Sequence, residues 1–150
     1  MYKHIICGFS GIGKSTAEQK HKGVIDFESS GYSHKFVAGF PDEKRNDFPT
    51  NYINALCEHM EKTSNTVYLL SCHEEVRNEL KNRGIAYIIA MPYHSLKEEY
   101  IRRWLKRGSS VEFIEMMCDR WDEMIASCER DDAPKIHLDR SEYLDDILPM

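Results

Sequence analysis

The chain has 150 residues, 41% of them hydrophobic, and a formal net charge of −5, values typical of one folded domain. The acidic balance argues against bulk electrostatic binding to long nucleic acid or to an anionic membrane surface. No apolar run approaches the ~20 residues of a membrane span, and the apolar run at residues 5–7 is too short for a secretory signal. The five cysteines are odd in number and lack CxxC spacing, which favours a reduced, cytoplasmic protein.

Short apolar runs alternate with amphipathic segments along the chain. The runs predict five buried strands, at 2–7, 24–27, 66–71, 85–91 and 135–138. Helices are predicted at about 14–22, 49–62, 71–83, 95–107, from a capping box at Ser109 and Glu112 onward, and at 141–148. Residues 28–48 are predicted to be irregular.

The predicted strands are apolar without strict alternation, which is expected when helices cover both faces of a sheet. The fold class is therefore predicted to be α/β, with a single doubly wound, parallel five-stranded sheet flanked by helices. Ligands of such a sheet bind at the carboxyl ends of its strands.

The stretch "GFSGIGKST" joins the first strand to the first helix and matches the phosphate-binding pattern G-x-x-x-x-G-K-[ST]. Its glycines allow backbone N–H groups to surround a phosphate chain, and the helix that follows turns its amino end toward the same anion. Lys14 can reach the β- and γ-phosphates, Ser15 can ligate Mg²⁺, and Thr16 can bond a phosphate oxygen. The motif predicts ATP or GTP with Mg²⁺ as cofactors, bound by Gly8, Ser10, Gly11, Ile12, Gly13, Lys14, Ser15 and Thr16.

With this motif and element order, the chain resembles the small P-loop kinases that phosphorylate nucleoside monophosphates or small metabolites, the group that includes shikimate and gluconate kinases. Its small size and lean loops are similar to those of phage-encoded nucleotide kinases. The resemblance spans nearly the whole chain and implies a P-loop NTPase fold of the nucleoside-monophosphate-kinase type. It implies one kinase domain over 1–150, with an acceptor-binding region at about 28–62 and a lid at about 95–120.

Two acids follow the second predicted strand, in "VIDFESS". Asp26 and Glu28 are two residues apart and so share one face. The pair resembles the Asp-x-Asp of shikimate kinases, with Glu in place of the second Asp. The resemblance implies that Asp26 acts in catalysis and holds the metal together with Ser15, and that Glu28 contacts the acceptor hydroxyl. The alternative is a strand-end pair that only caps turns.

Ser71 ends the third predicted strand, where many P-loop enzymes carry an acid, and this departure disfavours a motor ATPase or a GTPase. The helix that follows carries Arg77, as in gluconate kinases, and Arg77 could bind an acidic group of the acceptor or be an ordinary solvated arginine. The stretch "YIRRWLKRG" is strongly basic. In it, Arg103 and Arg107 lie one helical turn apart, and the resemblance implies that they are catalytic lid residues. A solvated basic face is the alternative, and Arg120 could join the same cluster.

Hydroxyls and aromatic rings in the region 28–62 suit a ring-bearing acceptor, although an ordinary loop is an equally simple reading. The residues are Ser29, Ser30, Tyr32, Tyr52, Phe36 and Phe48. Among them Ser29 and Tyr52 are predicted to bind the acceptor. Arg140, in the turn after the last strand, is predicted to stack on the base of the donor nucleotide.

These observations favour a kinase that moves the γ-phosphoryl group of ATP to a small-molecule acceptor, in first place a nucleoside monophosphate. A metabolite kinase or a 5′-hydroxyl polynucleotide kinase is the alternative within enzymes. A nucleotide-binding regulator without transfer activity is the alternative outside them, and the absent acid at Ser71 is its best support. An exposed stripe on the helix that contains Phe113 and Cys128 would make a homodimer.

Overall fold

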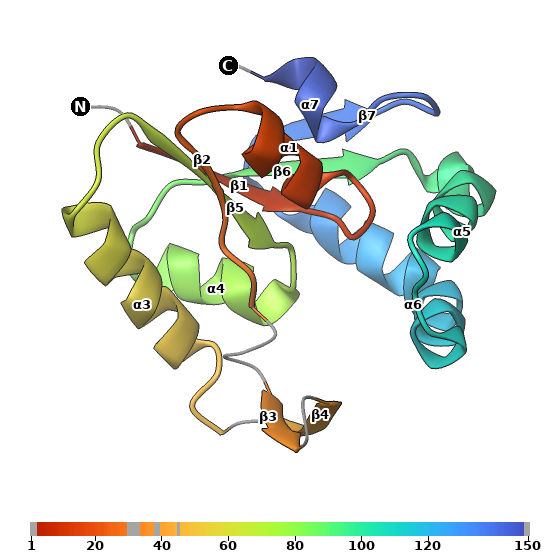
Figure 1. The fold of residues 1–150 in the computed structure, drawn as a ribbon, viewed down its shortest axis with the longest axis horizontal. Helices are drawn as coiled ribbons and strands as arrows, with labels where there is room; N and C mark the ends of the chain where they lie inside the picture. The colour runs from red at the N-terminus through yellow and green to blue at the C-terminus, as the bar shows by residue number, and fades with distance from the viewer. Residues whose placement is uncertain (1–2, 30–33, 38–39, 45, 149–150) are drawn as a thin grey trace.

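A computed structural model describes residues 3–29, 34–37, 40–44 and 46–148, with only the backbone described for Lys3 and for 34–44. Five strands form one parallel sheet in the order β2-β5-β1-β6-β7 (Figure 1). They are β1 (Lys3–Gly8), β2 (Val24–Asp26), β5 (Thr66–Ser71), β6 (Ile88–Pro92) and β7 (Lys135–Leu138). The predicted doubly wound α/β fold is confirmed.

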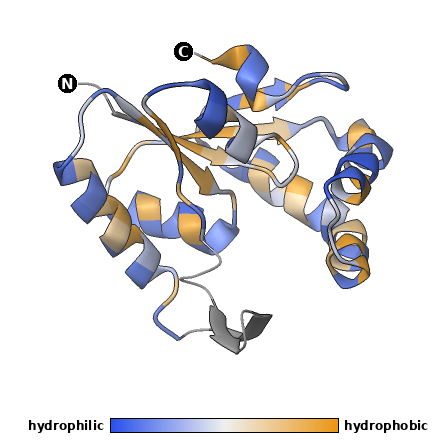
Figure 2. Ribbon diagram, viewed as in Figure 1, coloured by the Kyte–Doolittle hydropathy of each residue, from blue (hydrophilic) through white to orange (hydrophobic). Residues whose placement is uncertain are grey.

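The helices cover both faces of this sheet, as the apolar strands require. In Figure 1, α1 (Lys14–Lys20) and α7 (Leu144–Ile147) lie on one side of the sheet. On the other side lie α3 (Thr50–Glu61), α4 (Glu74–Asn82) and α6 (Val111–Arg130). A short 3₁₀ turn, η1 (His94–Leu96), leads into α5 (Lys97–Lys106), which packs beside α6. Figure 2 shows that the strands are mostly hydrophobic and that hydrophobic and hydrophilic residues alternate along the helices.

The prediction of an irregular segment over residues 28–48 is wrong in part. Strands β3 (His34–Val37) and β4 (Phe40–Lys44) pair in an antiparallel hairpin that stands apart from the main sheet (Figure 1). Polar and turn-forming residues interrupt this stretch, so it lacks the alternation by which a strand is recognised.

The capping box predicted at Ser109 and Glu112 is wrong, because the helix begins one residue later. The N-cap of α6 is Ser110, whose hydroxyl oxygen accepts a hydrogen bond from Phe113 N at 3.1 Å. Adjacent serines offer two equivalent caps, and the sequence pattern cannot choose between them.

The parallel strands bring three chain segments to one edge of the sheet. Gly8 at the end of β1 is paired in register with Ser71 at the end of β5, and Asp26 at the end of β2 is paired with Leu69. The phosphate-loop motif, the acid after β2 and the hydroxyl after β5 therefore face the same space. No helix among the described residues is long and apolar enough to span a membrane.

Candidate functional site

A cleft of about 1320 Å³ opens at the carboxyl ends of β1, β2 and β5. The phosphate-loop segment, the residues after β2 and β5, and residues of α1, α4, α5, α6 and the C-terminal turn line this cleft. Of the residues predicted from the sequence, the cleft brings together those of the loop except Ile12, and also Asp26, Glu28, Ser29, Arg77, Arg103 and Arg107.

The phosphate-binding loop has the backbone that its glycines allow. Gly11 and Gly13 have φ angles of 95° and 93°, in the left-handed region that side chains with a Cβ rarely adopt. A Cβ on Gly11 would lie 3.1 Å from Trp104 Nε1, and one on Gly13 would lie 3.1 Å from a ring carbon of Tyr143. Neighbouring aromatic side chains therefore close the back of the loop and leave its front to the cleft.

An aromatic cluster supports the loop from behind. Phe9, the second residue of the motif, is fully buried and packs edge to face against Trp121 at 5.4 Å and Tyr100 at 6.2 Å. Trp104 joins both rings and donates a hydrogen bond from Nε1 to the Ser10 carbonyl oxygen at 3.3 Å. These contacts fix the loop to α5 and α6, so the loop is a packed element with a defined shape.

Ser15 and Asp26, predicted as metal ligands, lie in direct contact. Ser15 Oγ donates to Asp26 Oδ2 at 3.0 Å, while Asp26 Oδ1 is buried and has no hydrogen-bond partner among the described residues. Burial raises the pKa of Asp26 against the lowering effects of Ser15 and Lys14. A buried carboxylate oxygen without a donor is costly and suits a cation.

Lys14 lies beside this pair, with Nζ donating to the Gly8 carbonyl oxygen at 3.0 Å. The hydroxyl of Ser71 is also buried, lines the cleft and lacks a hydrogen-bond partner within the described chain. The same residues contain no group of three or more His, Cys, Asp or Glu that could hold a metal alone. This donor set fits Mg²⁺, which takes one or two protein oxygens and completes its shell with phosphates and water.

Arg107 reaches across the cleft mouth from the end of α5 to the phosphate loop. Its Nη2 donates to Ser10 Oγ at 3.0 Å and its Nε to Ser109 Oγ at 2.8 Å. Partial desolvation of the guanidinium beside the cleft lowers the pKa of Arg107, although the residue as a whole is exposed, and the carboxylate of Glu28 opposes that shift. Glu28 and Ser29, the predicted acceptor contacts, line the same cleft, and the charge of Glu28 acts on both Asp26 and Arg107.

Arg103 is buried, with 6% of its surface exposed, and binds the protein itself. Its guanidinium donates to the carbonyl oxygens of Gly11 (3.0 Å), Arg140 (3.0 Å) and Glu142 (2.8 Å). It also lies between the rings of Tyr100 and Tyr143, at 4.4 and 3.8 Å from their centroids. In this geometry Arg103 holds the loop in shape, and its predicted catalytic role stays a prediction.

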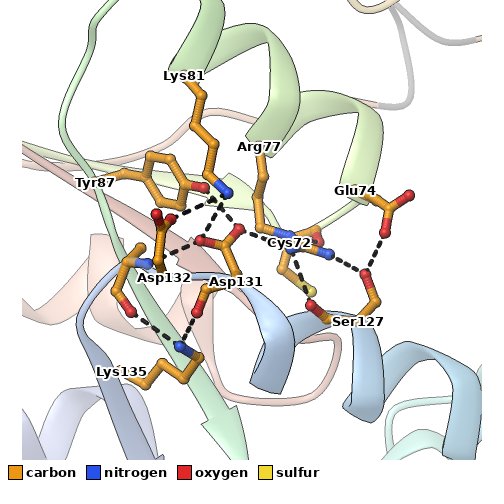
Figure 3. Close-up of polar contacts among 10 residues, drawn as sticks. Cys72, Glu74, Arg77, Lys81, Tyr87, Ser127, Asp131, Asp132 and Lys135 are labelled. Atoms are coloured by element: carbon orange, nitrogen blue, oxygen red, sulfur yellow. Dashed lines mark hydrogen bonds and ion pairs between the residues drawn. The ribbon is translucent and has the colours of Figure 1, made fainter.

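Arg77 lines the far end of the cleft within a buried ionic cluster (Figure 3). Its Nη1 donates to Asp131 Oδ2 at 2.8 Å, its Nε to the Cys72 carbonyl oxygen at 2.9 Å and its Nη2 to Ser127 Oγ at 2.7 Å. The sequence offered a solvated arginine or an acceptor ligand, and 3% exposure excludes the first of these. To bind an acceptor, Arg77 would have to give up contacts that join α4 to α6.

Three predicted residues do not present their side chains to the cleft. Tyr52 is fully buried, its hydroxyl donates to the Phe27 carbonyl oxygen, and its ring packs on Phe48 and Phe27. Ile12 is buried beneath the loop, where a Cβ on Gly8 would collide with it. Arg140 has an exposed side chain and contributes only its carbonyl oxygen, to Arg103. Ser30, Tyr32 and the side chain of Phe36 lie outside the described residues.

The predicted lid, 95–120, is largely tied to the body of the molecule. Tyr100, Arg103 and Trp104 on α5 and Met117 on α6 are buried, because they pack on the loop and the aromatic cluster. Lys106, Arg107 and Gly108 are exposed. A movement that kept the buried contacts would be confined to this turn.

Apart from Arg120, which could join the predicted basic cluster, sequence reasoning missed the contribution of α6 to the cleft. Trp121 and Ile125 on α6 are buried, but another face of the helix lines the cleft. That face carries Met116, Arg120 and Ser127. The spacing of three and four residues was a visible signal, but a helix with two apolar stripes does not reveal which one meets the core.

The fold and the loop together define a doubly wound α/β protein with a phosphate-loop motif after its first strand. A solved structure, the tunicamycin resistance protein of Deinococcus radiodurans, superposes with a TM-score of 0.62 over 97% of this chain and 90% of that one. The sequences are 15% identical, so the likeness concerns the fold. No family model and no curated protein sequence matches the chain.

Proposed function

We propose that the protein transfers the γ-phosphoryl group of ATP to a small acceptor in a Mg²⁺-dependent reaction, with a nucleoside monophosphate as the first acceptor class. The contact between Ser15 and Asp26 carries this proposal. It places a hydroxyl, and a buried carboxylate oxygen without a donor, at the front of a phosphate loop. Phosphoryl transfer depends on such positioning and on electrostatic stabilisation.

Each of the chain's own residues has a role in this reaction. Lys14 turns from the Gly8 carbonyl to the phosphates and neutralises their charge. Ser15 and Asp26 would hold Mg²⁺, directly or through water, and the ion would offset the charge of the phosphates. Arg107 stabilises charge on the transferred group, because a planar guanidinium fits phosphate oxygens in a bidentate manner. Glu28 and Ser29 orient the accepting oxygen.

The experiment is an acceptor screen with ATP and GTP, read by the appearance of phosphorylated product. The panel contains nucleoside monophosphates, sugars, sugar acids and a 5′-hydroxyl oligonucleotide. It also contains tunicamycin, because the structural neighbour is a tunicamycin resistance protein. A regulator would bind ATP without turnover under every condition, whereas a kinase shows turnover that depends on one acceptor.

Lys14→Ala is the decisive variant. We expect the transfer rate to fall more than about 100-fold, because the positive charge beside the phosphates is lost. The variant should stay folded, because the lysine side chain donates only to the Gly8 carbonyl oxygen. Lys22→Ala is the matched control, since Lys22 is exposed and lies outside the cleft lining. Wild-type turnover in Lys14→Ala would remove the loop from the reaction.

A further inference from the structure

Helix α6 lines one whole side of the cleft beyond the phosphate loop. Its lining residues recur every three or four positions, so they lie on one face of the helix. Three of them form what we call the methionine wall: Met116, Met117 and Met124. Met116 is 41% exposed, and it lines the cleft together with Met117 and Met124.

A cation interrupts this apolar wall. Arg120 follows Met116 by four residues and Met117 by three, so it lies one turn along the same face. Among the described residues its ion-pair partner is Glu123, which also lines the cleft, at 3.6 Å; both side chains are exposed, so this pair is worth little in solution. A row of flexible apolar side chains with a cation beside it suits a ligand with an apolar body and an anionic group.

Residues 28–62, which the sequence analysis predicted to bind the acceptor, contribute little apolar surface to the cleft. Among the described residues of 28–62, only Glu28 and Ser29 line the cleft. The aromatic rings of Phe48 and Tyr52 are buried against each other. The cleft volume of about 1320 Å³ exceeds the roughly 300–1,000 Å³ of a typical single-ligand pocket, so there is space for donor and acceptor side by side.

We propose that the methionine wall is the binding surface for the body of the acceptor, with Arg120 at its anionic group and its reacting oxygen toward Asp26. The acceptor is then a phosphate ester with an aromatic or apolar body, rather than a sugar acid or a bare sugar phosphate. This assignment rests on the proposed function, because it takes the ligand of the wall to be the molecule that receives the phosphoryl group. Met116 and Met124 become specificity-determining residues of that reaction.

The test uses the methionine methyl groups as reporters in the full chain. The protein carries seven methionines, and ¹³C-methyl labelling gives one NMR signal for each, assigned by single Met→Gln variants. Adenosine, thymidine and cytidine 5′-monophosphates are titrated in the presence of Mg²⁺ and a non-hydrolysable ATP analogue. Ribose 5-phosphate, which keeps the phosphate and lacks the base, is titrated in parallel.

We expect at least one nucleoside monophosphate to shift the signals of Met116, Met117 and Met124. Met60 on α3 and Met91 in β6 lie outside the cleft lining and serve as internal controls. Ribose 5-phosphate should shift the wall signals much less. Equal shifts with both ligands, or no binding by any nucleoside monophosphate, would overturn the proposal.

A pair of variants checks the energetic contribution. Met116→Gln should weaken binding of that nucleoside monophosphate about fivefold in calorimetric titration and leave ribose 5-phosphate binding unchanged. Leu105→Gln is the matched control, because Leu105 is 61% exposed and lies outside the cleft lining. Equal effects of the two variants would overturn the assignment.

Neither measurement needs turnover, so the two proposals fail separately. If the methionine signals shift but no transfer is detected with any acceptor, the proposed binding surface stands and the proposed kinase function is refuted. If an acceptor is phosphorylated but does not shift the signals of the methionine wall, the kinase function stands and the proposed role of the wall is refuted.

Discussion

The carboxylate of Asp26 lies at the end of β2 with one oxygen on Ser15 Oγ and the other buried without a partner among the described residues. Glu18 and Glu28 add negative charge nearby, and burial raises the pKa of Asp26. The folded protein without metal therefore binds the Asp26 proton more tightly than the unfolded chain does. Stability associated with this group is present at low pH and is lost as the pH rises from the ordinary aspartate pKa through the raised one.

Asp26→Asn should consequently stabilise the metal-free protein at pH 7 while it removes activity. The amide oxygen can still accept from Ser15, and the buried charge is gone. We expect a gain of about 1 kcal/mol, or roughly 2–4 °C in Tm, together with a loss of Mg²⁺-dependent transfer. Thermal unfolding in EDTA at pH 7 and pH 4 measures it, and the gain should shrink at the lower pH. A lower Tm for the variant at pH 7 would contradict this account.

Arg103 and Arg107, equivalent in the sequence pattern, should separate in experiment. Arg103→Ala leaves three carbonyl oxygens without their donor, so we expect a loss of about 2–4 kcal/mol in the free energy of unfolding. Arg107→Ala loses contacts to two serine hydroxyls at an exposed position, and its stability should change by less than about 0.5 kcal/mol.

The two variants should also differ in their kinetics. Arg107→Ala should keep ATP affinity within a few-fold and lower kcat by about 10²–10³, and Lys should rescue poorly because it lacks the planar fork. Denaturant titration and single-turnover rates on both variants decide the matter. A stable, inactive Arg103→Ala would return Arg103 to the catalytic group.

At the scale of elements, the buried cluster around Asp131 joins α4, α6 and the strands beside them (Figure 3). Burial alone would raise the pKa of Asp131, but hydrogen bonds from Ala133 N, Tyr87, Arg77 and Lys81 outweigh it and hold that pKa well below its usual range. Such a group stabilises the fold above the unfolded-state pKa of about 3.9, and the stabilisation is lost as the pH falls below it.

Asp131→Asn should cost about 3–5 kcal/mol at pH 7, because Arg77 would remain buried without its counter-charge. The difference from wild type should shrink below about pH 4. Asp132→Asn is the neighbouring control: its side chain is 93% exposed and contacts only Lys81, so we expect less than about 0.5 kcal/mol. Urea unfolding across pH 3.5–7 measures both, and a pH-independent difference would contradict the ionic explanation.

The element scale also explains what the sequence could and could not predict. Strands β5 and β7 match their predicted limits because apolar runs bounded by turn residues are a local signal. The resemblance to shikimate kinases implied that Ser15 and Asp26 hold one metal ion, and the parallel topology explains why the two side chains meet. The buried partners of Arg77 and Arg103 were not, because they come from residues distant in the chain and no local pattern records them.

At the scale of the whole molecule, the cleft walls come from both halves of one chain, so nucleotide binding should stabilise the entire domain. We expect one cooperative thermal transition. MgATP at about 100 times its Kd should add about 2.7 kcal/mol, which raises Tm by roughly 5–11 °C. Scanning calorimetry measures it, with Lys14→Ala as the control that gains much less at the same concentration. Two separate transitions, only one of them shifted, would contradict a single unit.

The back of the phosphate loop is closed by residues made much later in synthesis. Leu144 N donates to the Ile12 carbonyl oxygen at 2.7 Å, Tyr143 packs on Gly13, and Arg103 ties the loop to the turn that contains Arg140. A nascent chain therefore contains the complete motif before it contains the residues that shape it. Competence to hold nucleotide arises only after the distal turn has emerged, which makes ATP binding a report on the completed chain and not on the motif alone.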